Sequence, residues 1–586
     1  MDQGRRRQLI VCCDGTNNNL TGRKRDTNVS QLCELLAPDS QNQLLYYDPG
    51  VGNPGTLPEA AWWDKVQQKY ERLSGLAFGS GIYKNISEAY RFLMRNWHED
   101  ADVFLFGFSR GAFTARALGG LITTFGILRP DMDVMVPTLL NVYFRKRDTI
   151  DQKAAFDAVK KQISEMFAAG PARQAHVWFV GVWDTVESVG APVPFLSKTI
   201  SANPTIVGKR FDNVRHALAL DEFRNTFSPR LYLIEKGFDY RAQAQSIKQE
   251  WFAGCHSDVG GGYPNGQAGL SQQTLLWMVE EAASHAFGDR KLRLWPELLD
   301  ASGNPSGAAI SQFLATRGHA NGEREKRVHS EIYSTPWWAL TGMSVRDPAE
   351  ALDQARTPQA TPKQSPCVAA DGLQFPADTV WRNRRSILWL VVSAALLIIG
   401  AWAAGKYLLG PGATLAQSWC AMPFEWMTRL PGAMKANICF SNWQLGWFLP
   451  WQWPVRPPGE GLWPFQSPTR AVLVDFVIIA SYGYLLARAC GWAFARLARL
   501  RQVAQAVPKT LNWLGAAPLV AVLGDIAENG LTLVVVFQDR FNLLPTVAYI
   551  SASLMTVAAL AKWLGLIASL ALIARGCFAK QAKPAS

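Results

Sequence analysis

The stretch DVFLFGFSRGAFTARALGGL, residues 102–121, places a serine between two glycines where a strand-like run meets a helix-like one. The apolar residues Val103–Gly107 are typical of a buried strand, and the alanines and leucines after Gly111 recur as in a helix. Glycine tolerates the backbone of a tight turn, so this G-x-S-x-G predicts a nucleophile elbow that holds the hydroxyl of Ser109 clear of the backbone. The motif also arises by chance, so its meaning depends on the rest of the chain.

Residues 8 to about 290 alternate short β-rich runs with helical patterns. This alternation predicts an α/β fold, in which helices cover both faces of a mostly parallel sheet. The order of the strands cannot be inferred from it. The expected strands are Gln8–Cys13, Leu44–Tyr47, Val103–Gly107, His176–Trp183, Leu231–Glu235 and Trp251–Gly254, and the expected helices are Asn28–Leu36, Ile82–Trp97, Ala112–Thr124, Ala154–Phe167 and Val214–Phe223.

Three expected strands end in reactive residues: Ser109, then Asp184 in HVWFVGVWDTVESVG (176–190), then His256 in QEWFAGCHSDVGGGY (249–263). Ligands bind beyond the carboxyl ends of strands in sheets of this kind. A serine hydroxyl is a poor nucleophile until an imidazole takes its proton, and a carboxylate orients that imidazole and stabilises its charged form. The chain order Ser, Asp, His is that of α/β-hydrolases. We therefore predict a catalytic triad of these three residues.

Other residues compete for these roles. Asp258 follows His256 by two residues and is the alternative third member of the triad, or lines the site. His216 falls on the expected amphipathic helix, where packing or a hydrogen bond is a better explanation than catalysis. Of the remaining histidines, His176 begins a strand and is expected to be structural. We expect solvated surface positions for His98, His285, His319 and His329.

The first strand ends in VCCDGTNNN, residues 11–19. A D-x-D-G-T motif would indicate an aspartate-nucleophile phosphatase, but Cys12 holds the place of the nucleophile, which excludes that chemistry. The turn can instead offer backbone N–H groups to an oxyanion, with the N–H of Arg110 as the second donor. The oxyanion or substrate-binding candidates are Asp14, Gly15, Thr16, Arg110 and Asp258. A turn held only by Asp14 and the asparagines is the alternative.

The net charge of +12 does not indicate a nucleic-acid partner, because of where the charge lies. From residue 377 onward the chain has 18 Lys and Arg against 7 Asp and Glu, whereas the part before it is nearly neutral. The same C-terminal part holds 13 of the 23 tryptophans and nearly all long apolar runs. Basic flanks, tryptophans and apolar runs together predict a membrane domain. The nine cysteines lack metal-ligand spacing, so we expect neither metal nor cofactor.

The sequence divides into three parts. A catalytic domain is expected over residues 1–344, a Pro-rich linker over 345–380, and a helical membrane domain over 381–586. Its four expected spans are residues 387–405, 471–487, 514–537 and 543–574. Asp525 and Glu528 share one face of the third span, and Lys562 is their expected partner.

Five sequence blocks resemble a known family: CCDGTNNN, GFSRGAFTAR, GVWDTVESVG, RHALALDEFR and GCHSDVGGGY. In this order they look like the signature blocks of the uncharacterised α/β-hydrolase family with a GFSRG elbow. That family includes the catalytic domain of type VI secretion phospholipase effectors (Tle1-like). The resemblance covers roughly residues 6–290. It implies a Ser-Asp-His hydrolase and, for effector members, a phospholipase A that acts on bacterial membranes. The apparent membrane-spanning helices in the C-terminal half differ from what is expected of a secreted effector, because a protein with several such helices is hard to deliver in soluble form.

We therefore expect a membrane-anchored serine esterase that cleaves carboxylic esters, above all phospholipid acyl esters, through an acyl-enzyme. One alternative is an esterase or thioesterase for soluble substrates, and another is a type VI secretion-type antibacterial effector, whose partners would include an immunity or secretion-system protein. A third is a non-enzymatic membrane transducer or transport protein with a ligand-binding hydrolase fold. Positive charges near the span ends, and an N-terminus without a secretory signal, predict an inner-membrane protein whose catalytic domain faces the cytoplasm.

Overall fold

A computed structural model describes most of both halves of the chain. The described residues are 6–15, 25–39, 41–50, 76–145, 147, 149–169, 177–186, 188–189, 198–199, 211–232, 246–319, 328–346, 391–396, 468–503, 509–537 and 545–578. The chain divides into two compact units. Unit 1 comprises Met1–Glu222, Thr226–Ser330 and Arg346–Phe375, and unit 2 comprises Phe223–Asn225, Glu331–Val345 and Pro376–Ser586.

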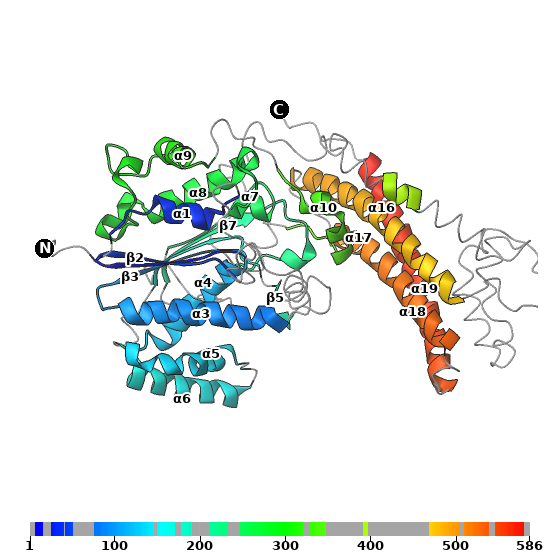
Figure 1. The fold of residues 1–586 in the computed structure, drawn as a ribbon, viewed down its shortest axis with the longest axis horizontal. Coiled ribbons are helices and arrows are strands. Elements are labelled where there is room, and N and C mark those ends of the chain that lie inside the picture. Colours follow the sequence, from blue (N-terminus) through cyan, green and yellow to red (C-terminus); the bar gives the residue numbers. More distant parts are fainter. Residues whose placement is uncertain are drawn as a thin grey trace, which may run out of the picture. The chain divides into compact units, whose positions relative to one another are not determined.

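A six-stranded sheet forms the centre of unit 1 (Figure 1). Its strand order is β2-β1-β3-β4-β7-β8, and every neighbouring pair is parallel. A separate antiparallel pair joins two very short strands, β5 and β6. The bounds are β1 Gln8–Cys13, β2 Gln43–Asp48, β3 Asp102–Phe108, β4 Val177–Trp183, β5 Ser188–Val189, β6 Lys198–Thr199, β7 Phe211–Ala219 and β8 Ser246–Phe252.

Helices cover both faces of the sheet, with α1 and α8 on one face and α3 and α4 on the other (Figure 1). Side chains along β1 alternate between the two cores: Leu9 and Val11 pack with α3 and α4, whereas Ile10 packs with α1 and α8. The helices of unit 1 are α1 Asn28–Leu35, α3 Leu76–Asn96, α4 Arg110–Phe125, α5 Val136–Phe144, α6 Ile150–Phe167, α7 His256–Gly260, α8 Gly269–Ala282 and α9 Gly307–Thr316, with short 3₁₀ turns at Pro130–Met135, Asn265–Gln267, His285–Arg290 and Pro296–Leu298.

The expected α/β class is confirmed, but one expected element is of the wrong type. Residues 214–223, expected as a helix, belong largely to strand β7. β7 lies between β4 and β8 and is buried along almost its whole length, although its sequence FDNVRHALA includes Asp212, Asn213, Arg215 and His216. Of the strand expected at 231–235, Leu231 and Tyr232 belong to no strand, and the rest lies outside the described residues.

The described part of unit 2 contains three helices that are long and apolar enough to cross a membrane. The candidate spans are Phe476–Ala498 on α16, Thr510–Leu531 across α17 and α18, and Leu560–Phe578 on α19. Of the first expected span, only residues 391–396 are described, and they are helical. The helices are α10 Glu331–Ser334, α16 Pro468–Val503, α17 Lys509–Gly515, α18 Ala517–Phe537 and α19 Pro545–Phe578, with a 3₁₀ turn at Pro336–Thr341.

These helices have the properties of a membrane-spanning domain. Helix α19 exposes a row of large apolar side chains spaced three or four residues apart, which suits contact with lipid. Glycines bring α18 and α19 together: a Cβ at Gly524 would lie 2.6 Å from the backbone nitrogen of Lys562. The exposed row comprises Leu554, Val557, Leu560, Leu564, Ile567 and Leu570.

The expected partnership of the charged residues in this domain is confirmed. Nζ of Lys562 lies 2.7 Å from Oδ1 of Asp525 and 3.0 Å from Oε2 of Glu528. The hydroxyl of Tyr482 on α16 donates to the other oxygen of Asp525 at 2.5 Å. These contacts link the four side chains, so the ionisable groups of α18 and α19 form one cluster.

Two boundaries differ from the sequence-based expectation. Residues 331–344, expected at the end of the catalytic domain, belong to unit 2. The linker expected from residue 345 begins with two buried residues, since Val345 is 7% and Arg346 is 6% exposed. The rest of that linker lies outside the described residues. Helix α16 also continues beyond the expected span, residues 471–487, to Val503, so Arg488 and Arg496 lie on the helix.

Candidate active site

Ser109, the serine of the elbow, is the single residue between the end of β3 and the start of α4. Ser109 has a φ of 58° and a ψ of −121°. A positive φ is uncommon for a residue with a side chain and persists only where the surrounding packing holds it. A Cβ at Gly107 would lie 2.5 Å from the carbonyl oxygen of Gly111, and one at Gly111 would collide with the carbonyl oxygen of Cys13. Both glycines are therefore required for α4 to start so close to the sheet.

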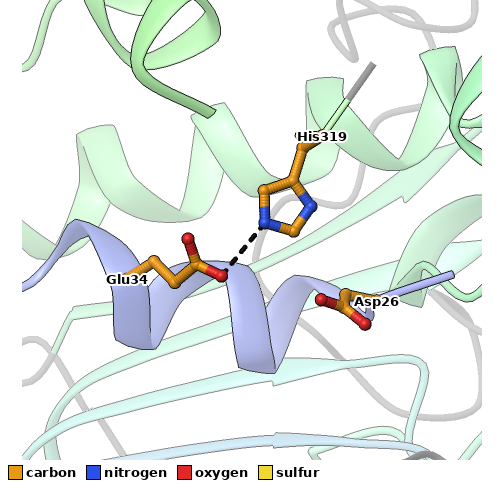
Figure 2. Close-up of side chains that lie close together, drawn as sticks. All are labelled: Asp26, Glu34 and His319. Carbon is orange, nitrogen blue, oxygen red and sulfur yellow. Dashed lines mark hydrogen bonds and ion pairs between the residues drawn. The ribbon is translucent and has the colours of Figure 1, made fainter. Parts of the chain in front are cut away.

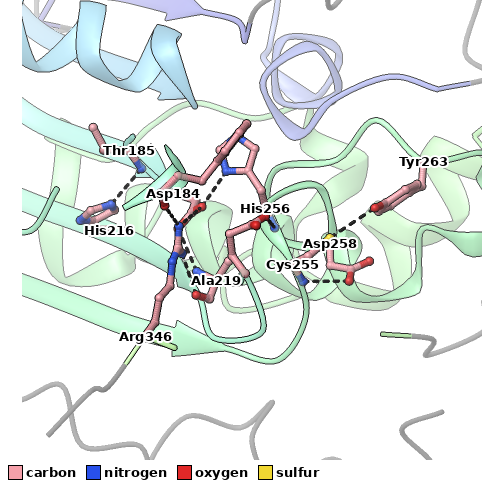
Figure 3. Close-up of polar contacts among 11 residues, drawn as sticks. Asp184, Thr185, His216, Ala219, Cys255, His256, Asp258, Tyr263 and Arg346 are labelled. Carbon is pink, nitrogen blue, oxygen red and sulfur yellow. Dashed lines mark hydrogen bonds and ion pairs between the residues drawn. The ribbon is translucent and has the colours of Figure 1, made fainter. Parts of the chain in front are cut away.

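Asp184 and His256 are joined by a hydrogen bond at the same edge of the sheet (Figure 3). Nδ1 of His256 lies 2.6 Å from Oδ2 of Asp184, and both residues are buried. Asp184 directly follows β4, and His256 begins α7 a few residues after β8. Phe108 pairs with Trp183 across β3 and β4, so Ser109 and Asp184 leave neighbouring strands at the same level. The structure thus brings all three predicted residues to one end of the sheet.

The Asp184 carboxylate accepts hydrogen bonds at both oxygens. Oδ1 accepts from the N–H of Ala219 at 3.0 Å and from Nη1 of Arg346 at 2.6 Å, and Oδ2 accepts from Nη2 of Arg346 at 3.1 Å as well as from His256. Burial alone would raise the pKa of Asp184, but the charge of Arg346 and the hydrogen bond from His256 outweigh it and hold that pKa well below its usual range. Asp184 is therefore an anion at neutral pH.

His256 is held by the loop that follows β7 and by two aromatic rings. The Asp221 carboxylate accepts the N–H two residues before His256 at 2.7 Å, and Oε2 of Glu222 accepts the N–H of His256 itself at 3.3 Å. The ring of Phe108 lies 4.6 Å and that of Phe227 lies 5.1 Å from the imidazole, centroid to centroid. These contacts fix the position of the imidazole on a helix of only one turn.

Asp258 bonds to a different histidine. Its Oδ1 lies 2.6 Å from Nδ1 of His329, and its Oδ2 accepts the N–H of Cys255 at 3.0 Å. The ring of Tyr263 stacks on His329 at 3.9 Å, so His329 is mostly buried and the expectation of a surface position is wrong. Burial raises the pKa of Asp258, and the hydrogen bond from His329 partly offsets it. The geometry favours Asp184 over Asp258 as the partner of His256.

The Asp14 carboxylate stabilises the turn after β1 by accepting hydrogen bonds. Its Oδ1 accepts the N–H of Gly15 at 2.6 Å, and its Oδ2 accepts the hydroxyls of Thr27 at 2.7 Å and Tyr47 at 2.8 Å. The carboxylate and the Gly15 N–H are thus both engaged within the turn, as in the structural alternative. Thr16 lies outside the described residues. Arg110 is the first residue of α4, where a backbone N–H has no partner within the helix.

His216 has a structural role, as expected, although it lies on a strand. Its Nε2 accepts the N–H of Thr185 at 3.2 Å, and its Nδ1 lies 3.2 Å from Oε1 of Gln249. Burial, followed by the nearby charge of Arg116, lowers the pKa of His216 to about 3, so the ring is neutral. A neutral ring with one donor and one acceptor nitrogen matches both contacts. His216 supports the backbone next to Asp184 and is not a base for the serine.

A second polar cluster lies around α1 (Figure 2). One ligand atom each of Asp26, Glu34 and His319 lies within 4.8 Å of the others, an arrangement that could hold a metal ion. Nε2 of His319 lies 3.1 Å from Oε1 of Glu34, and Nη1 of Arg317 lies 4.0 Å from the other oxygen of that carboxylate. His319 is 1% exposed, so its expected surface position is wrong. The Arg317 guanidinium already lies beside the Glu34 carboxylate, which favours an ion-pair cluster.

The remaining histidines and the missed residues complete the comparison. His98 and His285 are exposed, as expected, and His176 lies outside the described residues. Sequence reasoning missed Arg346, which stands in the Pro-rich segment without any motif around it, and Glu222, although it lies within the RHALALDEFR block. Only the burial of an arginine near an aspartate could have indicated the first, and burial is not visible in a linker-like sequence.

The arrangement is suited to proton transfer from a serine. With its Nδ1 bonded to Asp184, the imidazole of His256 presents Nε2 as a base. In the described part of the chain, Ser109 Oγ and His256 are not hydrogen-bonded to each other. In ligand-free enzymes this contact is often long and tightens only when substrate binds.

Comparison with known proteins shows which family the catalytic segment resembles. The family model "T6SS, Phospholipase effector Tle1-like, catalytic domain" matches residues 7–281, which include Ser109, Asp184 and His256. The "Uncharacterized protein YEL023C" of Saccharomyces cerevisiae is 30% identical over 233 residues, which are 38% of this chain and 32% of that protein. The match therefore spans about a third of the relative's length. No solved structure matches the chain. The resemblance predicted from the motifs is confirmed, and residues 7–281 are similar to the catalytic domain of Tle1-like phospholipase effectors, a family of lipase-type hydrolases.

Proposed function

We propose that this protein is a membrane-anchored serine esterase that cleaves phospholipid acyl esters through Ser109, His256 and Asp184. The observation that carries the proposal is the 2.6 Å bond between His256 and Asp184 beside a serine held at a φ of 58°. A buried imidazole–carboxylate pair at the end of the strand next to an elbow is the arrangement that activates a serine. The family match supports a lipid ester as substrate.

The reaction follows from the positions of these groups. Nε2 of His256 takes the hydroxyl proton as Ser109 Oγ attacks the ester carbonyl, and Asp184 stabilises the imidazolium. The N–H of Arg110 at the start of α4 donates to the oxyanion. The imidazolium then protonates the leaving alcohol, which leaves an acyl-serine. Water attacks this ester and gives a proton to His256, which passes it to Ser109 Oγ as the acyl–oxygen bond breaks and the fatty acid leaves.

The helices of unit 2 suit this substrate. Three candidate spans and the apolar row on α19 would hold the chain in a bilayer. Confinement to the surface that contains the substrate raises the effective lipid concentration at the site. We propose the inner membrane as this bilayer, with unit 1 on the cytoplasmic side. Basic residues that remain outside the candidate spans support this orientation, among them Arg382, Arg384, Arg499, Arg501 and Lys509.

Two assays test the function. Purified wild type in detergent or vesicles should release free fatty acid and lysophospholipid from phospholipid vesicles, measured by mass spectrometry. Ser109→Ala and His256→Ala should each lower turnover by about 10⁴- to 10⁶-fold, and the double variant little further, because the two residues act as one unit. A fluorophosphonate probe should label the wild type and not Ser109→Ala. Ser87→Ala is the matched control, because the Ser87 hydroxyl only bonds a carbonyl of its own helix.

The outcomes separate the candidate functions. Undiminished vesicle hydrolysis by Ser109→Ala would falsify the mechanism. Turnover of short soluble esters or thioesters but not of vesicles would favour a soluble substrate. A wild type that hydrolyses neither vesicles nor soluble esters and is not labelled by the probe would favour a non-enzymatic protein.

The type VI effector description of the matched family favours a second candidate, an antibacterial effector. Fluorescent-protein fusions at residue 378 and at the C-terminus test it, because both should be cytosolic if the enzyme is resident. A periplasmic signal at residue 378 would put the effector function first and would make an immunity or secretion-system protein a partner.

A further inference from the structure

The Arg346 side chain forms hydrogen bonds with several groups of the candidate active site. Besides both oxygens of Asp184, its guanidinium donates to the carbonyl of Ala219 at 2.7 Å and to that of Phe227 at 2.5 Å (Figure 3). Four hydrogen bonds from one planar fork tie together the ends of β4 and β7 and the turn Asn225–Phe227. The side chain is 4% exposed, so these bonds are shielded from water.

We propose that Arg346 is a positioning residue of the catalytic site, which fixes the Asp184 carboxylate and, through it, the imidazole of His256. Two of the three groups that contact the His256 ring are held by this one guanidinium: Asp184 through its carboxylate and Phe227 through its carbonyl. Asp184 also has a φ of 38°, a strained conformation that needs external support. The inference rests on the proposed function.

Arg346 lies outside the segment of the chain that matches the family. It lies 65 residues beyond the family-matched segment, which ends at residue 281. The residue before it, Val345, belongs to unit 2, where its N–H donates to Oδ1 of Asn512 at 2.8 Å. The catalytic segment shared with the family is therefore completed, in this chain, by a residue from the start of the segment that leads to the membrane helices. Activity should depend on that junction being intact.

The charge of Arg346 predicts a specific pH effect. The ionisable groups around the hydrogen-bonded pair of Asp184 and His256 are Arg346, Glu222 at the His256 N–H, and His216 with Arg116 behind Asp184. Of these, Arg346 directly neutralises Asp184. Without it, the full charge of Asp184 would act on the imidazole and favour its protonated, inactive form. The acid limb of the kcat/KM profile should then move to higher pH.

The test compares variants of the full-length protein. Arg346→Met keeps the length of the side chain and removes the charge, and should lower kcat by about 10²-fold with little change in KM, because a misplaced base slows the chemistry and not binding. The acid limb should move up by roughly one pH unit. Arg346→Lys should recover part of the loss, and added guanidinium should restore activity to Arg346→Ala.

Arg215→Met is the matched control. Arg215 lies on β7 of the same sheet and is equally buried. It pairs with Glu281 and has no described contact with the proposed triad. It should lose stability and keep both kcat per folded molecule and the pH profile. Wild-type kinetics in Arg346→Met, or a loss without any pH shift or guanidinium rescue, would overturn the inference. If Ser109→Ala were fully active, the proposed function itself would fail, whereas an inactive Ser109→Ala beside a fully active Arg346→Met would refute only the role of Arg346.

Discussion

Replacing Asp184 by asparagine should inactivate the enzyme through the tautomer of His256. Oδ1 of Asp184 accepts hydrogen bonds from the Ala219 N–H and from Arg346, which are donors only. An asparagine must therefore keep its oxygen at that position and turn its NH₂ group toward Nδ1 of His256. Because Nδ1 must then accept a hydrogen bond, the ring proton moves to Nε2, the atom that should take the proton of Ser109. The ring can no longer act as the base.

The expected loss is large and specific. A triad with its histidine in the wrong tautomer loses about 10⁴-fold in kcat, or about 5.4 kcal/mol of transition-state stabilisation. The assay is steady-state hydrolysis of a chromogenic ester and of phospholipid vesicles, corrected for folded protein. Asp102→Asn is the matched control: Asp102 is also 0% exposed and paired with arginines, Arg6 and Arg290, but it lies at the amino end of β3. It should lose stability and keep its turnover.

The same substitution has a pH signature. The pKa of Asp184 is lowered in the folded protein, so its stabilising contribution is complete above the pKa of an unfolded aspartate, about 3.9, and is lost as pH falls toward the folded value. Wild type should therefore lose stability on acidification below about pH 4 more steeply than Asp184→Asn, as measured by denaturant unfolding at a series of pH values. An Asp184→Asn enzyme with wild-type kcat, or with an unchanged acid slope, would refute this reasoning.

Two further predictions concern packing and the membrane helices. Gly111→Ala should destabilise unit 1 by about 1–3 kcal/mol in thermal unfolding, because its Cβ collides with the backbone around the end of β1. The control Gly266→Ala should keep its stability, because its Cβ would meet nothing within 4 Å. Equal stability of the two variants would contradict the packing of the elbow. Lys562→Met should lower the free energy of unfolding in detergent by about 3–5 kcal/mol, because two buried carboxylates lose their cation. Neutralising both carboxylates in the same variant should restore most of this stability. A Lys562→Met variant as stable as the wild type would show that the cluster does not depend on its charge balance.

Short-range patterns were sufficient to predict the architecture of unit 1 and the positions of its reactive residues. β1 was predicted at its observed bounds, and β3 and β4 to within a residue at each end, because a strand buried on both faces is a short apolar run that ends abruptly. Ser109, Asp184 and His256 each directly or closely follow such a run. The elbow is also local, since it needs only two glycines around the serine.

The same signals failed where local preference and tertiary environment disagree. Residues 214–223 are rich in alanine and leucine, which favour a helix, yet most of them form β7 because the sheet supplies partners on both sides. His319 and His329 stand in polar sequence and were expected at the surface. Their burial depends on Glu34 and Asp258, which are distant in the chain, and no pattern of neighbouring residues reports such a contact.

The hydrogen-bonding partners of the candidate catalytic residues could be found only in three dimensions. Asp184 was the predicted partner of His256 and Asp258 its alternative, both of them carboxylates, and the sheet register and the loop after β7 favour Asp184. Arg346 is 162 residues from Asp184 and carries no motif, because a guanidinium can bind a carboxylate from any position that the fold brings near. Sequence periodicity thus set which residues could react. The folding of distant segments onto one edge of the sheet set which of them touch, because burial and hydrogen bonding depend on proximity in space and not along the chain.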